Sequence, residues 1–278
     1  MTLKYLILCS ILAGFGTVLH AKSVPGLEGG PGKDGCGAEN DAFQPGEEVV
    51  YKIYYNLSPF WIAAGEVTFK VEDAGNDYRF EVVGSTYKSL EWFYRGLYTF
   101  QSDVDKASLM PHEFIRTIEE KKYSKYNKFV FDQNNGTVKT WQGKTKEETK
   151  TNILHFGHCM HDMISVLYYM RNLDFDRLSV GTTIPVNVFI EENYPLTVHV
   201  LGKNEEKRIH GLGKCKTHVF SPEVIAGEVF SEGTQMTIWV SADQNRIPLM
   251  IESPVRVGKI KAVLYSHKGL RYHLEGID

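Results

Sequence analysis

The sequence has few of the features that identify whole classes of proteins. Only four of its 278 residues are cysteine, which is too few for a scaffold held together by disulfides. Lys and Arg number 31 against 34 Asp and Glu, and no long basic run occurs, which argues against a nucleic-acid partner. There is no G-x-S-x-G elbow, H-E-x-x-H motif, paired C-x-x-C motif or phosphate-binding glycine loop. No catalytic residues, no cofactor and no class of enzyme are therefore predicted.

The longest apolar stretch lies at the N-terminus and is short. Lys4 precedes an apolar run from Tyr5 to Leu19, and the small residue Ala21 follows it. This layout is typical of a secretory signal peptide, whereas a membrane-spanning helix needs about 20 apolar residues. We therefore predict a signal peptide over residues 1–21 and no transmembrane span in the mature chain; the alternative is an uncleaved anchor.

Removal of the signal peptide leaves three cysteines, Cys36, Cys159 and Cys215. An odd number in an exported chain leaves at least one thiol unpaired or joined to another molecule. Residues 22–46 are rich in glycine and proline and are predicted to be a flexible tether. Cys36 lies in this tether and is the expected odd residue, so a Cys159–Cys215 disulfide is open. Residues 47–278 are predicted to form a single domain.

From Glu47 onward, hydrophobic residues alternate with polar ones at the period of a β-strand. In residues 67–72, for example, every second side chain is Val or Phe. Other segments rich in β-branched and aromatic residues are predicted strands: 49–55, 78–83, 128–131, 137–141, 184–190, 197–201, 236–240 and 262–265. Asn134-Asn135-Gly136 predicts a hairpin with a type I′ turn, whose positive φ angles these residues adopt at low cost. The domain is thus expected to be mainly β.

One segment departs from this period. Hydrophobic residues recur at spacings of three and four between Asp162 and Asn172, and the Asp162 carboxylate is well placed to cap a helix. We predict one central helix over about residues 162–172, which divides the chain into two strand-rich halves. Each half contains a predicted Ser-Asp turn between a strand and a proline, at residues 102–111 and 241–248, which suggests two similar halves that use one hairpin design.

A run of potential metal ligands precedes the helix. It contains His155, His158, Cys159 and His161. On a regular helix or strand these side chains would not converge, so only a bent loop would bring them together. The run therefore indicates either a metal site or polar residues leading into a capped helix; the second interpretation is favoured, and no metal site is assigned.

Residues 60–100 are rich in aromatic side chains, which supply large rigid contact areas. They either fill the interior of a curved sheet or line a cavity for an apolar ligand. The aromatic cluster consists of Phe60, Trp61, Tyr87, Trp92, Phe93, Tyr94, Tyr98 and Phe100.

Four motifs occur along the chain: Phe43-x-x-Gly46-Glu47-x-x-x-Tyr51, Ala64-Gly65-Glu66, Asp162-x-x-Ser165-x-Leu167-Tyr168-Tyr169-x-Arg171 and Trp239-x-Ser241-x-Asp243-x-x-Arg246-Ile247-Pro248. Together they resemble the domain-of-unknown-function 3108 family of exported bacterial envelope proteins. The resemblance covers residues 43–270 and implies a mainly β protein of the periplasm or cell envelope of Gram-negative bacteria. The expected sheet is also similar to that of periplasmic lipoprotein carriers, which implies a curved antiparallel sheet or an open half-barrel with one central helix.

The motif residues are expected to serve the scaffold rather than a ligand. A tight turn is predicted over residues 243–248, with Pro248 opening the next strand. Arg171 is expected to pair with a buried acid, and Arg246 with Asp243 or a carbonyl. The motif residues in question are Asp162, Tyr169, Arg171, Trp239, Ser241, Asp243, Arg246 and Pro248. No ligand-binding residue is assigned.

Three functions stay open. The leading hypothesis is non-enzymatic binding of a hydrophobic or amphipathic envelope ligand such as a lipid. The second is an envelope scaffold or accessory subunit that presents its sheet edges to a protein partner. The third is a metal-dependent hydrolase that uses the His155–His161 run. A cavity smaller than the ~300 Å³ typical of ligand pockets would favour the scaffold.

Overall fold

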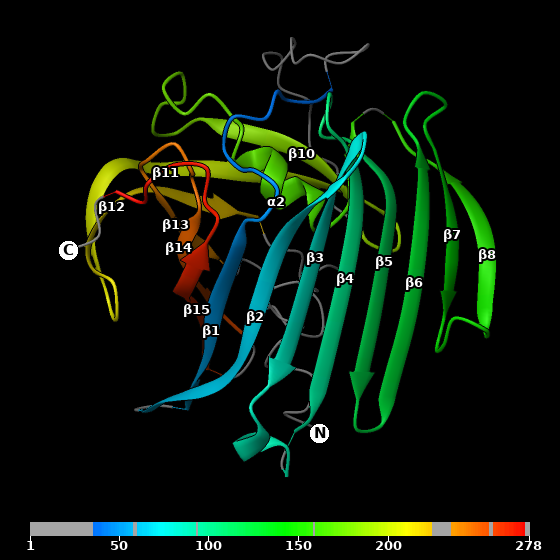
Figure 1. The fold of residues 1–278 in the computed structure, drawn as a ribbon, viewed down its shortest axis with the longest axis horizontal. Coiled ribbons are helices and arrows are strands. Elements are labelled where there is room, and N and C mark those ends of the chain that lie inside the picture. The colour runs from blue at the N-terminus through cyan, green and yellow to red at the C-terminus, as the bar shows by residue number, and fades with distance from the viewer. Residues whose placement is uncertain are drawn as a thin grey trace.

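The structure is a computed structural model that describes residues 36–57, 60–92, 94–157, 159–223, 235–255 and 258–275. In this part of the chain, one 15-stranded sheet that does not close curls around a single short α-helix, α2 (Ser165–Met170) (Figure 1). The prediction of a mainly β, open curved sheet with one central helix is confirmed. None of the helices described is long and apolar enough to span a membrane.

The strands follow the chain as two meanders, one on each side of α2. Before the helix lie β1 (Glu48–Leu57), β2 (Phe60–Ala74), β3 (Asp77–Thr86), β4 (Gly96–Asp105), β5 (Pro111–Glu120), β6 (Tyr123–Asp132), β7 (Thr137–Gly143), β8 (Thr149–His155) and β9 (Met160–His161), with the 3₁₀-helix η2 (Lys88–Leu90) between β3 and β4. After it lie β10 (Thr183–Phe189), β11 (Asn193–Ile209), β12 (Gly213–Pro222), β13 (Thr237–Ser241), β14 (Pro248–Pro254) and β15 (Lys259–Lys268).

The two meanders join through the first and the last strand of the chain. The strand order is β8-β7-β6-β5-β4-β3-β2-β1-β15-β14-β13-β12-β11-β10-β9, so that β1 pairs with β15 at the centre of the sheet. All pairs are antiparallel except β9 with β10. The two edges, β8 and β9, are consecutive in the chain, which brings the ends of the curled sheet toward each other.

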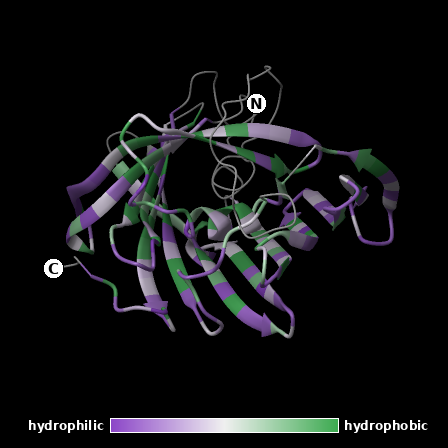
Figure 2. Ribbon diagram, turned by 90° about the horizontal axis from the view of Figure 1, so that it is seen from above, coloured by the Kyte–Doolittle hydropathy of each residue, from purple (hydrophilic) through white to green (hydrophobic). Residues whose placement is uncertain are grey.

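Alternation along the strands separates the two faces of the sheet (Figure 2). In β4, for example, every second residue from Gly96 is buried. The inner side chains pack on α2, where the ring of Tyr168 stacks 3.8 Å from that of Phe80. Every segment predicted to be a strand overlaps an observed strand. The hydrophobic core therefore lies between the helix and the concave face.

The hairpin at residues 134–136 is present, but its turn differs from the prediction. Asp132 pairs with Thr137, which leaves four residues in the loop. Of the three predicted turn residues, only Gly136 has a positive φ, 61°. The Asp132 carboxylate instead accepts hydrogen bonds from the backbone and side-chain nitrogens of Asn135. This side-chain support makes a longer turn favourable.

The helix is shorter than the predicted range of 162–172. Asp162 Oδ1 accepts hydrogen bonds from the backbone N–H groups of Ile164 and Ser165, at 2.7 and 3.0 Å, so the expected capping carboxylate is present. Arg171 and Asn172 follow the last helical turn, and Asn172 Nδ2 donates to the carbonyl of Tyr168. That bond satisfies a carbonyl that helix continuation would otherwise use.

The turn predicted at residues 102–111 begins later than expected, because Ser102 and Asp103 lie within β4 and residues 106–110 connect β4 to β5. Ser102 is buried and donates to Asp162 Oδ2 at 2.6 Å, so a turn-forming residue serves here as a partner of the helix cap. The equivalent prediction at residues 241–248 is correct, since this segment connects β13 to β14.

Residues 36–46, predicted to belong to the tether, pack against the domain instead. Ala42 and Phe43 are fully buried, and Cys36 forms a disulfide with Cys159. The expectation that Cys36 stays outside an intrachain disulfide is therefore wrong. A Cys159–Cys215 disulfide, which the sequence left open, is not formed, and Cys215 lies buried in β12. The predicted signal peptide and residues 22–35 of the tether lie outside the described residues.

Candidate functional site

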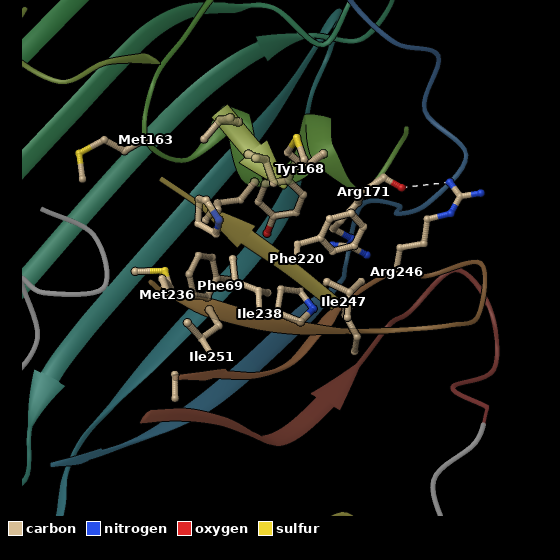
Figure 3. Close-up of a pocket in the computed structure, with 18 of the residues that line it drawn as sticks. Phe69, Met163, Tyr168, Arg171, Phe220, Met236, Ile238, Arg246, Ile247 and Ile251 are labelled. Atoms are coloured by element: carbon tan, nitrogen blue, oxygen red, sulfur yellow. Dashed lines mark hydrogen bonds between the residues drawn. The ribbon is translucent and has the colours of Figure 1, made fainter. Parts of the chain in front are cut away.

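A groove lies between α2 and the inner face of the sheet (Figure 3). Its volume is about 220 Å³, and it runs along β1, β2, the helix and the strands from β10 to β15. We call it the apolar groove. The residues that line it include Tyr51, Phe69, Leu167, Val198, Phe220 and Ile251. Because nearly all of these side chains are hydrocarbon or aromatic, the groove suits an apolar group.

Strand alternation directs these side chains inward. In β1, Val49, Tyr51 and Ile53 are all buried and all line the groove. In β11, Leu196 and Val198 do the same, while Thr197 between them points to the other face. The groove is therefore an extension of the hydrophobic core, at a place where the side chains of α2 and of the sheet do not fill the space between them.

One end of the groove contains a buried ion pair. Arg171 Nη1 and Nη2 donate to the two carboxylate oxygens of Glu47 at 2.5 and 2.9 Å. Nε and Nη2 also donate to the carbonyls of Asn245 and Ala42, at 2.9 and 3.1 Å. Four of the five N–H donors of this guanidinium are therefore hydrogen-bonded, and its charge is neutralised in place.

Arg246 lies at the same end, with a positive φ of 50°. Its Nη1 donates to the carbonyl of Arg171 at 3.0 Å, drawn as a dashed line in Figure 3, and to Asp41 at 2.9 Å. The guanidinium also lies 5.3 Å from the ring centre of Phe175. This second arginine is paired as well.

The two phenols of the groove are neutral. Burial raises the pKa of Tyr51 and of Tyr168, so neither ionises in the physiological range. With Glu47 and Arg171 paired, the long walls of the groove are mostly uncharged; Glu223, which also lines the groove, is exposed and lies 3.1 Å from His199.

The opposite end of the groove borders a different polar cluster. Met163 lines the groove there, away from Arg246 (Figure 3), and its sulfur accepts from Arg116 Nη1 at 3.7 Å. Arg116 Nη2 also donates to Glu191 at 2.5 Å, and Lys125 contacts the same carboxylate oxygen. Burial acts to raise the pKa of Glu191, but the charge of Arg116 and the bond from Lys125 outweigh it and hold that pKa below its usual range.

The run of potential metal ligands does not gather into a site among the described residues. Cys159 is used in the disulfide with Cys36, His155 ends β8 on the surface, and His158 lies outside the described residues. His161 is buried beside Tyr169, and burial lowers its pKa to about 3, so its imidazole is neutral. The group of three potential ligands that the described residues do bring together is Asp77, Asp105 and His112, elsewhere on the sheet.

The aromatic cluster of residues 60–100 does not line the groove. Phe60 and Trp92 are 70% and 78% exposed, whereas Tyr94, Tyr98 and Phe100 are buried in the sheet; Phe93 lies outside the described residues. The groove takes its aromatic residues from outside this cluster: Tyr51, Phe69, Tyr168, Phe175 and Phe220. Alternation in β1, β2 and β11 was the signal that could have located them.

Residues 50–265 match the family described as "Protein of unknown function (DUF3108)". The chain belongs to the DUF3108 family. No curated protein matches it. A solved structure titled "Crystal Structure of Beta-barrel-like Protein of Domain of Unknown Function DUF1849 from Brucella abortus" matches with a TM-score of 0.55 and 9% identity, over 82% of this chain and 98% of that one. At this identity the likeness extends to the fold alone.

The motif residues of this DUF3108 chain divide between the groove and the scaffold. Arg171, Arg246 and Pro248 line the groove. Asp162 caps α2, and Tyr169 packs on His161. Trp239, in β13, lies beneath Lys207, whose ammonium is 4.3 Å from the ring centre.

The turn over residues 241–248 is held by its own polar side chains. Asp243 Oδ1 accepts from Ser241 Oγ and from the backbone N–H of Asn245, both at 2.9 Å. Ser241 Oγ in turn accepts from the N–H of Ile247 at 3.0 Å. Pro248 then opens β14 beside a register shift between Trp239 and Val240. This turn places Arg246 at the groove.

The volume of the groove limits what it can hold. A volume of about 220 Å³ is below the ~300 Å³ typical of ligand pockets, and by this measure it favours the scaffold hypothesis. An apolar cavity of ~150 Å³ nevertheless admits a benzene-sized molecule. A bulky ring system is therefore disfavoured in this DUF3108 groove, and a slender chain fits better.

Proposed function

We propose that the protein binds a single hydrocarbon chain of a hydrophobic or amphipathic molecule in the apolar groove. The observation that carries the proposal is the apolar groove itself, about 220 Å³ in volume and lined almost wholly by apolar side chains, at the centre of the fold. A narrow chain that enters such a channel removes apolar surface of both partners from water, at about 25 cal/mol per Å².

The role is binding rather than catalysis. At one end of the groove Glu47 and Arg171 are paired with each other and Arg246 is paired with Asp41, and the phenols of Tyr51 and Tyr168 are neutral. Together with the signal peptide predicted at the N-terminus, this supports a carrier or sensor of an apolar molecule in the periplasm or cell envelope.

A groove-filling variant with a matched control tests the proposal. Val198→Trp introduces an indole into the groove, whereas Thr197→Trp places the same side chain on the other face of β11. In isothermal titration with 1-dodecanol, the wild type and Thr197→Trp are expected to bind and Val198→Trp is not. Solvent extraction and mass spectrometry of the natively purified protein are expected to release a chain-bearing molecule.

The alternative is an envelope scaffold, favoured by the small groove volume and by the exposed Phe60 and Trp92. An empty protein that also fails to bind 1-dodecanol would reject the carrier and favour the scaffold. Equal binding by both tryptophan variants would show that the chain lies somewhere else.

A further inference from the structure

A row of polar side chains crosses the inner face of the sheet next to Met163. Arg116 of β5, Asn127 of β6 and Gln142 of β7 are direct neighbours in register. Arg116 and Asn127 are 2% and 0% exposed, although they occupy inward positions that elsewhere in these strands hold phenylalanine and isoleucine. Buried polar side chains of this kind are expected to be fully hydrogen-bonded.

This row contains two hydrogen-bond donors that are not satisfied. Arg116 Nε and Nη2 both donate to Asn127 Oδ1, at 3.1 and 2.7 Å, and this fixes which end of the amide faces the guanidinium. Asn127 Nδ2 must then point elsewhere. Among the described residues, Asn127 Nδ2 and Gln142 Nε2 are buried and have no hydrogen-bond partner. Such groups favour the arrival of an acceptor.

The charges of the cluster favour the same kind of group. Arg116 and Lys125 share one carboxylate, that of Glu191, so the three side chains carry one net positive charge. Arg116 Nη1 has the weak acceptor Met163 Sδ as its partner. Lys125 and Glu191 are partly exposed, so the cluster can be reached from solvent.

The other end of the groove lacks these properties. At that end Arg171 and Arg246 pair with Glu47 and Asp41, so the charges balance, and among the described residues neither arginine has a buried nitrogen without a partner. A polar head with acceptor oxygens therefore finds unsatisfied buried amide donors at the Arg116 end.

We propose that Arg116, Asn127 and Gln142 bind the anionic head of an amphiphile, a carboxylate or phosphate, whose hydrocarbon chain lies in the apolar groove. The proposal rests on the proposed function and adds the class of head group. Met163, which lines the groove and contacts Arg116, is the point where chain and head meet. The ion pair with Glu191 also ties β5 to the segment after β10, but that role leaves the two amide donors unexplained.

The test compares amphiphiles that differ only in the head. Wild-type protein is titrated with sodium dodecanoate and with 1-dodecanol below their aggregation limits. Dodecanoate is expected to bind about tenfold more tightly, the size of a charge-assisted hydrogen bond. Inorganic phosphate alone is the third probe, and it is expected to bind far more weakly than dodecanoate.

Two variants remove the preference by different routes. Gln142→Glu replaces an unsatisfied donor by a carboxylate that repels the anionic head, and Arg116→Gln removes the buried charge. Both are expected to abolish the preference for dodecanoate while 1-dodecanol binds as before. Gln142→Glu keeps the test available if Arg116→Gln fails to fold. Arg79→Gln is the matched control, because Arg79 pairs with Asp103 on the opposite face of the sheet and should leave the preference unchanged.

The outcomes separate the two proposals. Equal binding of dodecanoate and 1-dodecanol by the wild type would overturn the head-group site and leave the groove intact. Loss of the preference in Arg79→Gln would overturn it as well, since a general effect of charge would then be responsible. Phosphate binding as tight as that of dodecanoate would replace the amphiphile by a free anion. Failure of both amphiphiles to bind would overturn the proposed function itself.

Discussion

Arg171 joins three parts of the chain that are far apart in sequence. It follows α2, pairs with Glu47 before β1, and donates to Asn245 in the turn before β14. Replacement by methionine would leave the 1% exposed Glu47 carboxylate buried without its partner. We expect Arg171→Met to lower the free energy of unfolding by about 3–5 kcal/mol, measured by urea denaturation followed by circular dichroism.

The control for this prediction is Arg79→Met, which breaks a bidentate pair of comparable geometry at the surface. Because water screens partly exposed pairs, we expect a loss of at most about 1 kcal/mol there. Similar losses of the free energy of unfolding in the two variants would show that burial of the Glu47–Arg171 pair does not make its loss more destabilising.

Individual residues could be assigned from the sequence only where the signal was local. The sequence predicted that Arg171 pairs with a buried acid, but Glu47 lies 124 residues away, and only the fold brings it near. Arg116 was missed although a signal existed. In β5 it lies in phase with the buried Phe114 and Ile118, and a charged residue in that phase must face the interior. Asn127 is in phase with Phe129 and Phe131 in the same way.

At the scale of elements, the Cys36–Cys159 disulfide fastens the N-terminal segment to the connection between β8 and β9. It links residues 123 apart, so it restricts the unfolded chain strongly. We expect Cys36→Ser to lower the free energy of unfolding by about 2–4 kcal/mol, and dithiothreitol to have the same effect on the wild type. Urea denaturation with and without reductant checks this.

Cys215→Ala is the matched control, because Cys215 lies outside this disulfide. This variant should keep its full sensitivity to reductant, whereas Cys36→Ser should have none. Peptide mapping without reduction should recover the Cys36–Cys159 link. Sensitivity to reductant that depends on Cys215 would instead support the Cys159–Cys215 pairing that the sequence left open.

Strands were predictable where one face is buried and the other exposed. The inward positions of β1, β2 and β3 produce a clear alternation, and these strands were located correctly. The edge strand β8 was not, because its side chains are mostly exposed and carry no alternation. Ser102 was assigned to a turn because serine favours turns locally, whereas a tertiary bond to Asp162 holds it within β4. The walls of the groove follow from alternation, but its location depends on how the sheet curls.

At the scale of the whole molecule, the two meanders form one sheet because β1 pairs with β15. Nine residue pairs connect these strands, as many as connect neighbours within a meander. Local sequence signals indicate two strand-rich halves and say nothing about this pairing, which joins residues near the two ends of the domain. The groove depends on it, because its walls come from both meanders.

Hydrogen exchange tests this arrangement directly. We expect the amides of β1 and β15 to exchange among the slowest of the chain, since both strands are paired on both sides and carry buried residues at alternate positions. The edge strand β8, exposed and paired on one side, is expected to exchange much faster. Peptide-level mass spectrometry after deuterium labelling measures both in one experiment, with β8 as the internal control. Exchange of β1 and β15 as fast as that of β8, while the strands inside each meander stay protected, would mean that the halves are separate domains. In that case the groove would not persist in solution.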